Sequence, residues 1–293
     1  MVPPLNILEA LLFETPYVIS INGGEIVKTR FALIVVLLIA VISSAGLLNN
    51  PENRFKLELD YEIGFTGVIF HTIQFGQTGT VLNYVKDGGQ DVLFPYQRYT
   101  AGLSIGKHTV YFLYQPLTVQ SKVQLKNDLV VDGVTFPAGS GILLNYGFPF
   151  YRVRYTYDVL RKGNSYLALG LSLQLRNADI YFESLDGTKF VDNKNVGPVP
   201  IIKVKGAYWL NKKAYLAADI DGFYASSRFI NGADFDFEGS VLDASLRAGL
   251  FLTDYFETYF NVRFIGGTAK GTSENSGSPD GFTDNRLRPL TSA

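Results

Sequence analysis

Side chains that could carry out catalysis are few in this chain. It has no cysteine and only two histidines, His71 and His108. A histidine beside a carboxylate can act as a general base, and Asp87 or Asp91 could supply that carboxylate to His71. No serine stands at a defined spacing for a Ser/His arrangement. The sequence therefore predicts that the chain is not an enzyme, with the histidines in structural roles.

The same scarcity limits cofactors and partners. Without cysteine neither a disulfide nor a thiolate metal site can form, and two histidines are too few for a His-rich metal site. The 26 Lys and Arg nearly balance the 27 Asp and Glu, which gives no electrostatic case for binding nucleic acid. We expect no cofactor, no metal ion and no nucleic-acid partner.

Charged residues instead recur at every second position. Over 55–65 the odd positions are apolar, whereas Lys56, Glu58, Asp60 and Glu62 are charged. Successive side chains of a strand point to opposite faces, so one face here is apolar and the other ionic. This pattern returns along the chain with turn residues between the runs, which is typical of a transmembrane β-barrel.

The alternation predicts nine positive and eight negative side chains on the inner face of such a barrel. They are Lys56, Glu58, Asp60, Glu62, Arg98, Arg152, Arg154, Asp158, Arg176, Lys203, Lys205, Asp219, Asp221, Asp243, Arg247, Glu257 and Arg263. The near balance predicts a structural network of ion pairs that fills a narrow, largely closed lumen. We expect a structural or surface-interaction role through the extracellular loops. The alternative is a narrow transport barrel that offers a polar path for small solutes, and the second alternative is an outer-membrane enzyme. A lumen of one sign would have favoured an ion-selective pore.

Ten strands account for the segments in which apolar and polar residues alternate. We expect them over 55–69, 96–105, 108–119, 145–160, 165–182, 201–209, 214–224, 239–250, 255–265 and 282–293. The connections alternate between short turns and stretches rich in Gly, Asn, Asp and Ser, and the long ones are expected over 74–95, 120–144, 183–198, 226–238 and 267–281. The fold class is therefore all-β, a transmembrane antiparallel up-and-down β-barrel of ten strands with eight as the alternative, with short periplasmic turns and long extracellular loops.

The alternative to a membrane barrel is a soluble ten-stranded barrel such as a calycin, which would keep its charges outside. The chain contains 22 Phe and 18 Tyr, and the apolar face is rich in aromatic residues, as expected at a membrane interface. The aromatic girdles are expected from Tyr96, Tyr99, Phe148, Tyr151, Tyr166, Tyr208, Tyr255 and Phe256. We expect a monomer in the bacterial outer membrane, in contact with outer-membrane lipid and with the barrel-assembly machinery during biogenesis.

The one long apolar stretch, FALIVVLLIAVI, follows a basic flank and precedes small residues. This layout predicts a signal peptide over 26–45, with cleavage near Ala45. Residues 1–25 then form a mis-assigned N-terminal extension, and 46–293 form the barrel. The alternative is an uncleaved N-terminal anchor, but the stretch is short for a membrane-spanning helix.

Several segments resemble a family of uncharacterised Gram-negative outer-membrane β-barrel proteins. They are PYQRYTAGLSIGKHTVYFLYQPL, FPFYRVRYTYDVL with LALGLSLQLRNADIYF, and NVGPVPIIKVKGAYWLNKKAYLAADIDGFYA. The likeness spans about residues 54–288 and implies the fold and the compartment, but no activity or binding residues. Barrels of this kind usually end in an aromatic residue, whereas this chain ends at Ala293 with Pro289 inside the last expected strand. The tenth strand is therefore the weakest part of the expectation.

Overall fold

The computed structural model describes residues 55–227, 236–272 and 280–293, and the elements in them are β-strands. Among the described residues there is no helix with the length and apolar character needed to cross a membrane. The expected N-terminal extension and signal peptide, 1–45, lie outside the described residues.

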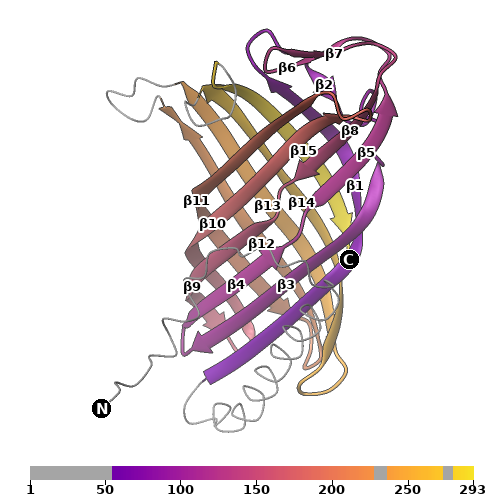
Figure 1. Ribbon diagram of the computed structural model, residues 1–293. Coiled ribbons are helices and arrows are strands. Elements are labelled where there is room, and N and C mark those ends of the chain that lie inside the picture. The colour runs from indigo at the N-terminus through magenta and orange to yellow at the C-terminus, as the bar shows by residue number, and fades with distance from the viewer. Residues whose placement is uncertain (1–54, 228–235, 273–279) are drawn as a thin grey trace, which may run out of the picture. The chain divides into compact units, whose positions relative to one another are not determined.

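Ten antiparallel strands form a closed ring (Figure 1). In ring order, which is also chain order, they are β1 (Phe55–Phe75), β3 (Leu93–Ile105), β4 (His108–Gln115), β9 (Phe150–Lys162), β10 (Ser165–Ser184), β11 (Phe190–Trp209), β12 (Ala214–Ser226), β13 (Phe237–Phe251), β14 (Glu257–Thr272) and β15 (Phe282–Ser292). Each strand pairs with the next, and β15 pairs with β1. The expected antiparallel barrel of ten strands is confirmed.

The period of two is clearest on β9, where buried and exposed residues alternate. Arg152 and Arg154 are buried inside the barrel, whereas Tyr151 and Val153 are exposed on its outer surface. This is the reverse of the usual arrangement in water-soluble proteins, which bury apolar side chains and expose charged ones.

Short connections join the strands at one end of the barrel, as expected. Two of them are two-residue turns that begin with Gly106 and Gly163. Both glycines have φ near +60°, at 60° and 58°, a conformation that favours glycine. Two-residue turns of this kind connect neighbouring antiparallel strands without splaying them.

At the opposite end, the expectation of a long loop over 183–198 is wrong. β10 and β11 continue well beyond the expected strands and remain paired as far as Glu183 and Phe190. Asn, Asp and Gly residues in this stretch are typical of loops, but backbone pairing with the neighbouring strand overrides that preference.

The tenth strand forms despite Pro289. The register of β1 against β15 shifts between Val68 and Phe70, opposite Pro289 and Arg288. A bulge of this kind accommodates a residue that has no N–H to donate to the ladder. The irregularity is local, because regular pairing resumes on both sides of it.

Two of the expected long loops are ordered and together form a folded unit at this end of the barrel, which we call the cap (residues 76–92 and 116–149). It contains β2 (Leu82–Asn83), β5 (Thr118–Gln124), β6 (Leu129–Val131), β7 (Val134–Phe136) and β8 (Gly141–Gly147). β8 pairs with both β5 and β10, which joins the cap to the barrel wall. Asp132 and Gly133 connect β6 to β7 with positive φ at both residues, as a type I′ turn requires.

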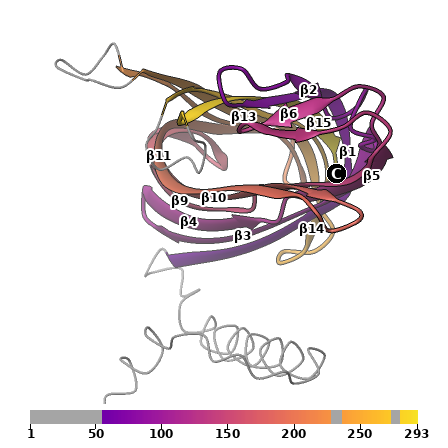
Figure 2. The ribbon, with the colours of Figure 1, turned by 45° about the horizontal axis from the view of Figure 1, so that its top comes forward.

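The cap has its own apolar core, built with inward side chains from the upper ends of the barrel strands. Its buried members are Ile73, Phe75, Leu82, Tyr84, Leu125, Leu129, Val131, Phe136, Ile142, Leu144, Tyr146, Ile180 and Phe182. Of the cap strands, β2, β5 and β6 lie toward β1, on the side of the barrel away from β11 (Figure 2). Two of the expected extracellular loops therefore form a packed structure.

The polarity of the barrel wall inverts where the cap begins. On β10, odd positions from Leu167 to Leu175 are exposed leucines and the residues between them face the interior. Beyond Arg176 the buried residues are apolar, as at Ile180 and Phe182, and the outward ones are polar. The strand thus has a lower segment that is apolar outside and an upper segment that is apolar inside.

Candidate functional site: an ionic layer between two cavities

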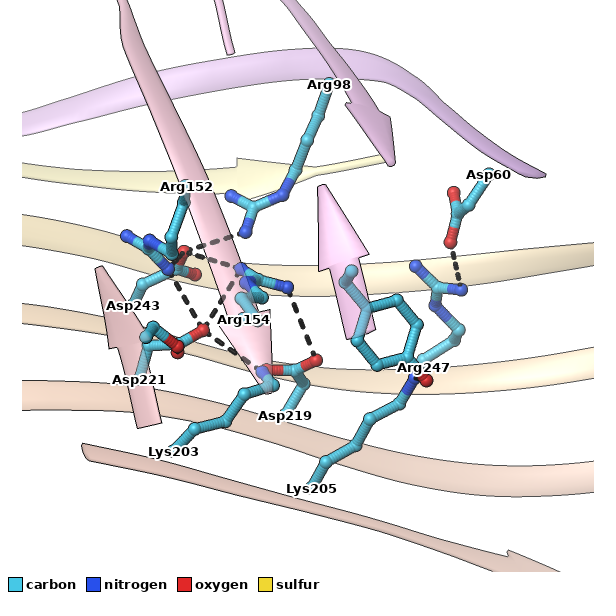
Figure 3. A network of polar contacts seen from close by, with 12 residues as sticks. Asp60, Arg98, Arg152, Arg154, Lys203, Lys205, Asp219, Asp221, Asp243 and Arg247 are labelled. Carbon is cyan, nitrogen blue, oxygen red and sulfur yellow. Dashed lines mark hydrogen bonds and ion pairs between the residues drawn. The ribbon is translucent and has the colours of Figure 1, made fainter. Parts of the chain in front are cut away.

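Charged side chains from seven strands meet at one level inside the barrel. Figure 3 shows the arginines, the lysine and the aspartates that gather around Asp221 and Asp243. The period of two directs every second residue of each strand into the interior, so strands distant in sequence contribute to one cluster. We call this cluster the ionic layer. Its members are Glu62, Arg98, Arg152, Arg154, Lys203, Asp219, Asp221, Asp243 and Arg263. All of them except Asp219 are buried.

Asp243 of β13 is surrounded by arginines from three strands. Arg98 Nη2 and Arg152 Nη1 each donate to its Oδ2 at 2.8 Å, and Arg263 Nη1 donates to its Oδ1 at 2.5 Å. Arg154 Nη2 lies 3.7 Å from the same carboxylate. These cations supply the compensation that a buried carboxylate requires.

Asp221 of β12 lies directly opposite Asp243 in the sheet register. Like charges in this relation repel one another. Arg152 Nη1 bridges them, because it lies 2.9 Å from Asp221 and 2.8 Å from Asp243. Lys203 Nζ lies 3.1 Å from Asp221 Oδ2, and Ser172 Oγ donates to Oδ1 at 2.7 Å. These donors compensate the repulsion between the two carboxylates.

Glu62 of β1 connects the layer to the last strands of the barrel. Arg263 donates to it through Nη2 at 3.1 Å and Nε at 3.2 Å, and Asn261 Nδ2 donates at 2.8 Å. Just below, Arg247 Nη1 donates to Asp60 at 2.6 Å, and its Nη2 lies 3.4 Å from Glu62. These contacts cross-link β1 to β13 and β14 through the lumen.

Neutral side chains complete the layer, and the pattern of charged residues did not reveal them. Gln174 Oε1 accepts hydrogen bonds from Arg152 Nε at 3.0 Å and Nη2 at 2.5 Å. Gln115 Oε1 accepts one from Arg98 Nη1 at 2.8 Å. The serine and the asparagine described above belong to the same group. All four are buried and occupy the alternate strand positions that face the interior, which we call the inward parity. This alternation was the sequence signal that could have identified them.

Eight of the seventeen side chains expected in the lumen network lie outside the ionic layer. They are Lys56, Glu58, Asp60, Asp158, Arg176, Lys205, Arg247 and Glu257. Asp60 and Arg247 pair just below the layer, as described above. Lys205 Nζ lies 3.9 Å from Glu58 and donates to Tyr111 Oη at 2.8 Å.

The other four of these side chains lie nearer the two ends of the barrel. Asp158 pairs with Arg161 beside a short turn, and Glu257 accepts a hydrogen bond from a tyrosine hydroxyl at 2.9 Å. Arg176 donates to an asparagine at 2.9 Å in the upper half, and Lys56 is exposed. Parity therefore predicted which side chains face the interior. It did not predict their height along the barrel, because height depends on the tilt and stagger of the strands.

The ionic layer separates two cavities. The lower cavity, toward the short turns, has a volume of about 790 Å³, and Arg154 and Arg263 of the layer border it. The upper cavity, toward the cap, has a volume of about 230 Å³, and Arg152 and Gln174 border it. Among the described residues none lines both cavities. Each carboxylate of the layer accepts from or lies beside cations, an arrangement that suits a structural role rather than a general base.

Three aromatic residues expected in the girdles point inward instead. Tyr96 is buried beside the ionic layer, Tyr166 lines the lower cavity and Phe148 lines the upper one. Tyr96 has the same parity as Arg98, two residues later, and this parity should have decided its direction. The remaining expected girdle residues are exposed. Tyr99, Tyr151 and Tyr208 lie on barrel strands, whereas Tyr255 and Phe256 lie in the short turn before β14 and border the lower cavity.

His71 is buried between the barrel and the cap. Its ring stacks on Tyr84 at a centroid distance of 4.1 Å and meets Tyr146 edge-on at 4.3 Å. Its Nδ1 lies 2.5 Å from Gln90 Oε1. Burial lowers the pKa of His71 to about 4, against an opposing effect of the Gln90 hydrogen bond. His71 is thus in contact with an amide, and the geometry is that of a packed core residue.

The described residues contain no group of three or more His, Asp or Glu side chains arranged to hold a metal ion. No protein-family model matches the chain, and no curated protein is significantly similar to it. The resemblance to uncharacterised outer-membrane barrels therefore stays a prediction, and the functional argument depends on the ionic layer, the cavities and the outer surface of the barrel.

Proposed function

We propose that this chain is an integral β-barrel of a bacterial outer membrane that does not conduct ions and that holds the cap at the outer surface. Its partners in this proposal are outer-membrane lipid and, during biogenesis, the barrel-assembly machinery. The observation that carries the proposal is the ionic layer, a buried set of charges that fills a barrel whose outer surface is apolar.

The outer surface supports the membrane location. Ile63, Leu171, Ile202, Leu246 and Phe260 come from five different strands and are exposed by 60%, 66%, 58%, 69% and 60%. Apolar patches of this extent are rare on monomeric proteins in water. They are the normal contact surface of a barrel in lipid.

The height of the apolar surface fits one bilayer. On β10 the outward leucines run from Leu167 to Leu175, which is nine residues of strand. A tilted transmembrane strand needs about 9–11 residues to cross the hydrocarbon core. Above them Asn177 and Asp179 are the next outward residues. A closed ring also leaves no unpaired sheet edge through most of this band, as lipid requires.

The interior supports a closed lumen. Eight members of the ionic layer are buried at one level, and the cavities on its two sides share no lining residue among those described. A hydrated ion would have to separate these buried charge pairs, and breaking a buried ion pair is costly. A surface role, with the cap as the exposed structure, is therefore better supported than diffusion through the barrel.

Conductance tests the closed lumen. We expect no stable conductance of porin size when the purified protein is inserted into planar bilayers, with a porin inserted under the same conditions as the positive control. A large and reproducible conductance would overturn the closed lumen and favour a narrow transport barrel for small solutes.

Surface proteolysis tests the location and the orientation. In intact cells trypsin should reach Lys189, in the connection between β10 and β11, but not Lys212 or Lys213 in a short turn at the other end. The protein should also fractionate with the outer membrane and show heat-modifiable gel mobility. Cleavage at Lys212 in intact cells would invert the topology, and recovery in the soluble fraction would remove the membrane proposal.

A further inference from the structure

The upper cavity has the character of a ligand site. Its walls are mainly apolar and include Phe150, Val199, Phe223, Val241 and Ile265. Ligand pockets in proteins typically combine such walls with a few polar groups. An engineered apolar cavity of about 150 Å³ binds benzene, so a volume of about 230 Å³ has room for about nine heavy atoms.

The barrel wall is interrupted beside this cavity. The register that pairs β11 with β12 ends at Ile202 and Gly222. Above this point β11 stays paired with β10, and β12 stays paired with β13. In the described part of the chain no register pair joins the upper parts of β11 and β12. We call residues 197–201 of β11 and 223–226 of β12 the seam.

Two prolines mark the β11 side of the seam. Proline has no N–H and is confined to edges or bulges of sheets. The N–H groups of residues two apart, such as Pro198 and Pro200, point to the same edge of a strand. Because β11 remains paired with β10 here, the missing donors belong to the edge that faces β12. The cavity is lined by Pro198, Val199 and Pro200 in succession, so it reaches this edge.

The hydrogen-bonded ladder is interrupted at a second place, where other residues of the chain cover the exposed strand edge. β5 ends the sheet path that runs through β8, and the cap segment 83–92 packs against it. Ser121 Oγ donates to Gly88 O at 2.7 Å, and a Cβ on Gly89 would lie 3.2 Å from the Val123 side chain. Cap residues therefore occupy that break, whereas the described residues at the seam border a cavity.

The seam lies within the upper part of the apolar band. The register places Pro200 opposite Leu173 and Pro198 opposite Leu175, the last outward leucines of β10. Arg176, the next residue, marks the boundary above which the outer surface is polar. A molecule that passed from the lipid through the seam would bring its apolar part into the cavity and its polar end to the level of Arg176.

In the described part of the chain Arg176 lacks the carboxylate partners that the arginines of the ionic layer have. It is half-buried, borders the cavity and donates through Nη2 to Asn195 at 2.9 Å. Its Nε is buried without a hydrogen-bond partner, and no carboxylate of the described residues lies within ion-pair distance. Arginine beside an apolar pocket suits a carboxylate or phosphate, which it can bind through two parallel hydrogen bonds.

We propose that the upper cavity binds a single-chain anionic amphiphile that enters from the membrane through the seam. A chain of about eight carbons fills the apolar walls, and a carboxylate or phosphate head pairs with Arg176. This inference rests on the proposed membrane location and adds a ligand to it. The closed barrel is then a receptor for a membrane-derived molecule as well as an anchor for the cap.

Direct binding tests the ligand class. The full chain in lipid nanodiscs is titrated with tritiated octanoate, and binding to empty nanodiscs is subtracted. We expect saturable binding of one octanoate per barrel and at least tenfold weaker competition by octanol than by octanoate. Octyl phosphate in the same competition shows which head is preferred. The absence of saturable binding, or equal competition by octanol, would overturn the proposal.

Two pairs of variants test the site, each checked for heat-modifiable folding. Arg176→Gln should weaken octanoate binding about tenfold. It should leave the affinity for octanol unchanged, because only the charge is lost. Val241→Trp should abolish binding by filling the cavity, whereas Leu242→Trp, on the outer face of the same strand, should not. Unchanged binding in folded Arg176→Gln and Val241→Trp would show that the ligand binds elsewhere.

The route through the seam is tested by cross-linking, which the absence of native cysteine makes specific. Cysteines at Pro200 and Tyr224, one on each side of the seam, are joined by a short thiol cross-linker. We expect this to slow octanoate association at least tenfold. The control joins cysteines at Val204 and Ile220, which the register already pairs. Equal rates in both cross-linked proteins would overturn entry through the seam.

Failure of this inference differs from failure of the proposed function. A barrel that fractionates with the outer membrane and does not conduct, yet binds no octanoate, rejects the ligand and keeps the location. A chain recovered as a soluble protein rejects the location, and saturable octanoate binding in solution would then reject entry from the membrane.

Discussion

Asp243 is the residue on which the ionic layer depends most. Asp243→Asn keeps the shape of the side chain but removes the negative charge that faces four arginines. The loss of one partner from a buried ion-pair network typically costs about 3–5 kcal/mol. We expect the free energy of unfolding in lipid vesicles, measured by urea titration, to fall by about this amount.

Glu257→Gln provides the matched control. Glu257 is also an inward carboxylate, but it is half-buried near the short turns and accepts a hydrogen bond from Tyr215. Its replacement should cost less than about 1 kcal/mol, as is common for partly exposed charges. Equal losses in the two variants would mean that the ionic layer contributes no more than any other inward carboxylate.

His71 should make the cap sensitive to acid. It lies in the upper part of β1, where its ring packs against Tyr84 and Tyr146 of the cap core. Its pKa is about 4 in the folded protein, below the ordinary 6.5. The unfolded cap therefore binds more protons, so stability rises with pH between 4 and 6.5 and is lost as pH falls through this range. The total change is about 3 kcal/mol.

Hydrogen exchange of the cap amides, corrected for intrinsic rates, measures this effect. Protection in the cap should decrease between pH 6.5 and pH 4 in the native protein. His71→Phe retains a ring for stacking but has no proton to bind, so its protection should change much less over the same range. An equal pH response in both proteins would assign the acid sensitivity to other groups.

Alternation along the strands identified the residues that face the interior, but not which of these residues contact one another. It placed Lys56 and Arg152 on the same face, yet one is exposed at the rim and the other is fully buried. The difference arises from the stagger of the strands, which is set by hydrogen-bond register between segments far apart in sequence. The two carboxylates that face each other across β12 and β13 could not be paired before that register was known.

At the scale of elements, the cap is a second folded core joined to the barrel. Phe136 is fully buried in it and lies in the short hairpin of β6 and β7. Phe136→Ala should destabilise the cap by about 3–5 kcal/mol. Trypsin should then cut faster at Lys122 and Lys126, whereas the heat-modifiable mobility of the barrel should stay unchanged.

Val81→Ala is the control for the cap variant, because Val81 is an exposed cap residue. It should leave both the cleavage rate and the gel mobility unchanged. Loss of barrel mobility in Phe136→Ala would show that the cap and the barrel unfold as one unit.

The strands were more predictable than the connections. Apolar and charged residues alternate over the lower half of the barrel, and this pattern located ten strands. The cap could not be predicted in the same way. Its short strands carry no long alternation, and its core combines Phe136 of a loop with Ile73 and Phe182 of two barrel strands. The inversion of polarity near Arg176 also resembles continued alternation, because a strand keeps its period of two while its faces exchange character.

At the scale of the whole molecule, Leu171→Arg distinguishes lipid from water around the barrel. Leu171 is 66% exposed, so in water the change would cost little, within about 0.5 kcal/mol. In a bilayer a lipid-facing arginine near the midplane costs about 2–4 kcal/mol. We expect the larger value when the free energy of unfolding is measured by urea titration in lipid vesicles.

Leu185→Arg is the control for that measurement. Leu185 is similarly exposed, at 56%, but lies in the connection beyond the apolar band. It should cost little in vesicles, because its surroundings there are aqueous. Equal and small effects at both positions would contradict a membrane around the leucines of β10.

The inward ion pairs join residues far apart along the chain, and this has a consequence for how the barrel is assembled. Asp60 and Glu62 of the first strand meet Arg247 and Arg263, which follow them by 187 and 201 positions. If a strand slipped by one residue, its ionic side chains would turn to the apolar outer surface and its leucines to the interior. Such an intermediate would be penalised on both faces at once. The ion pairs thus discriminate against misaligned strands, and they do so only when the first and last strands meet, which makes barrel closure a cooperative step.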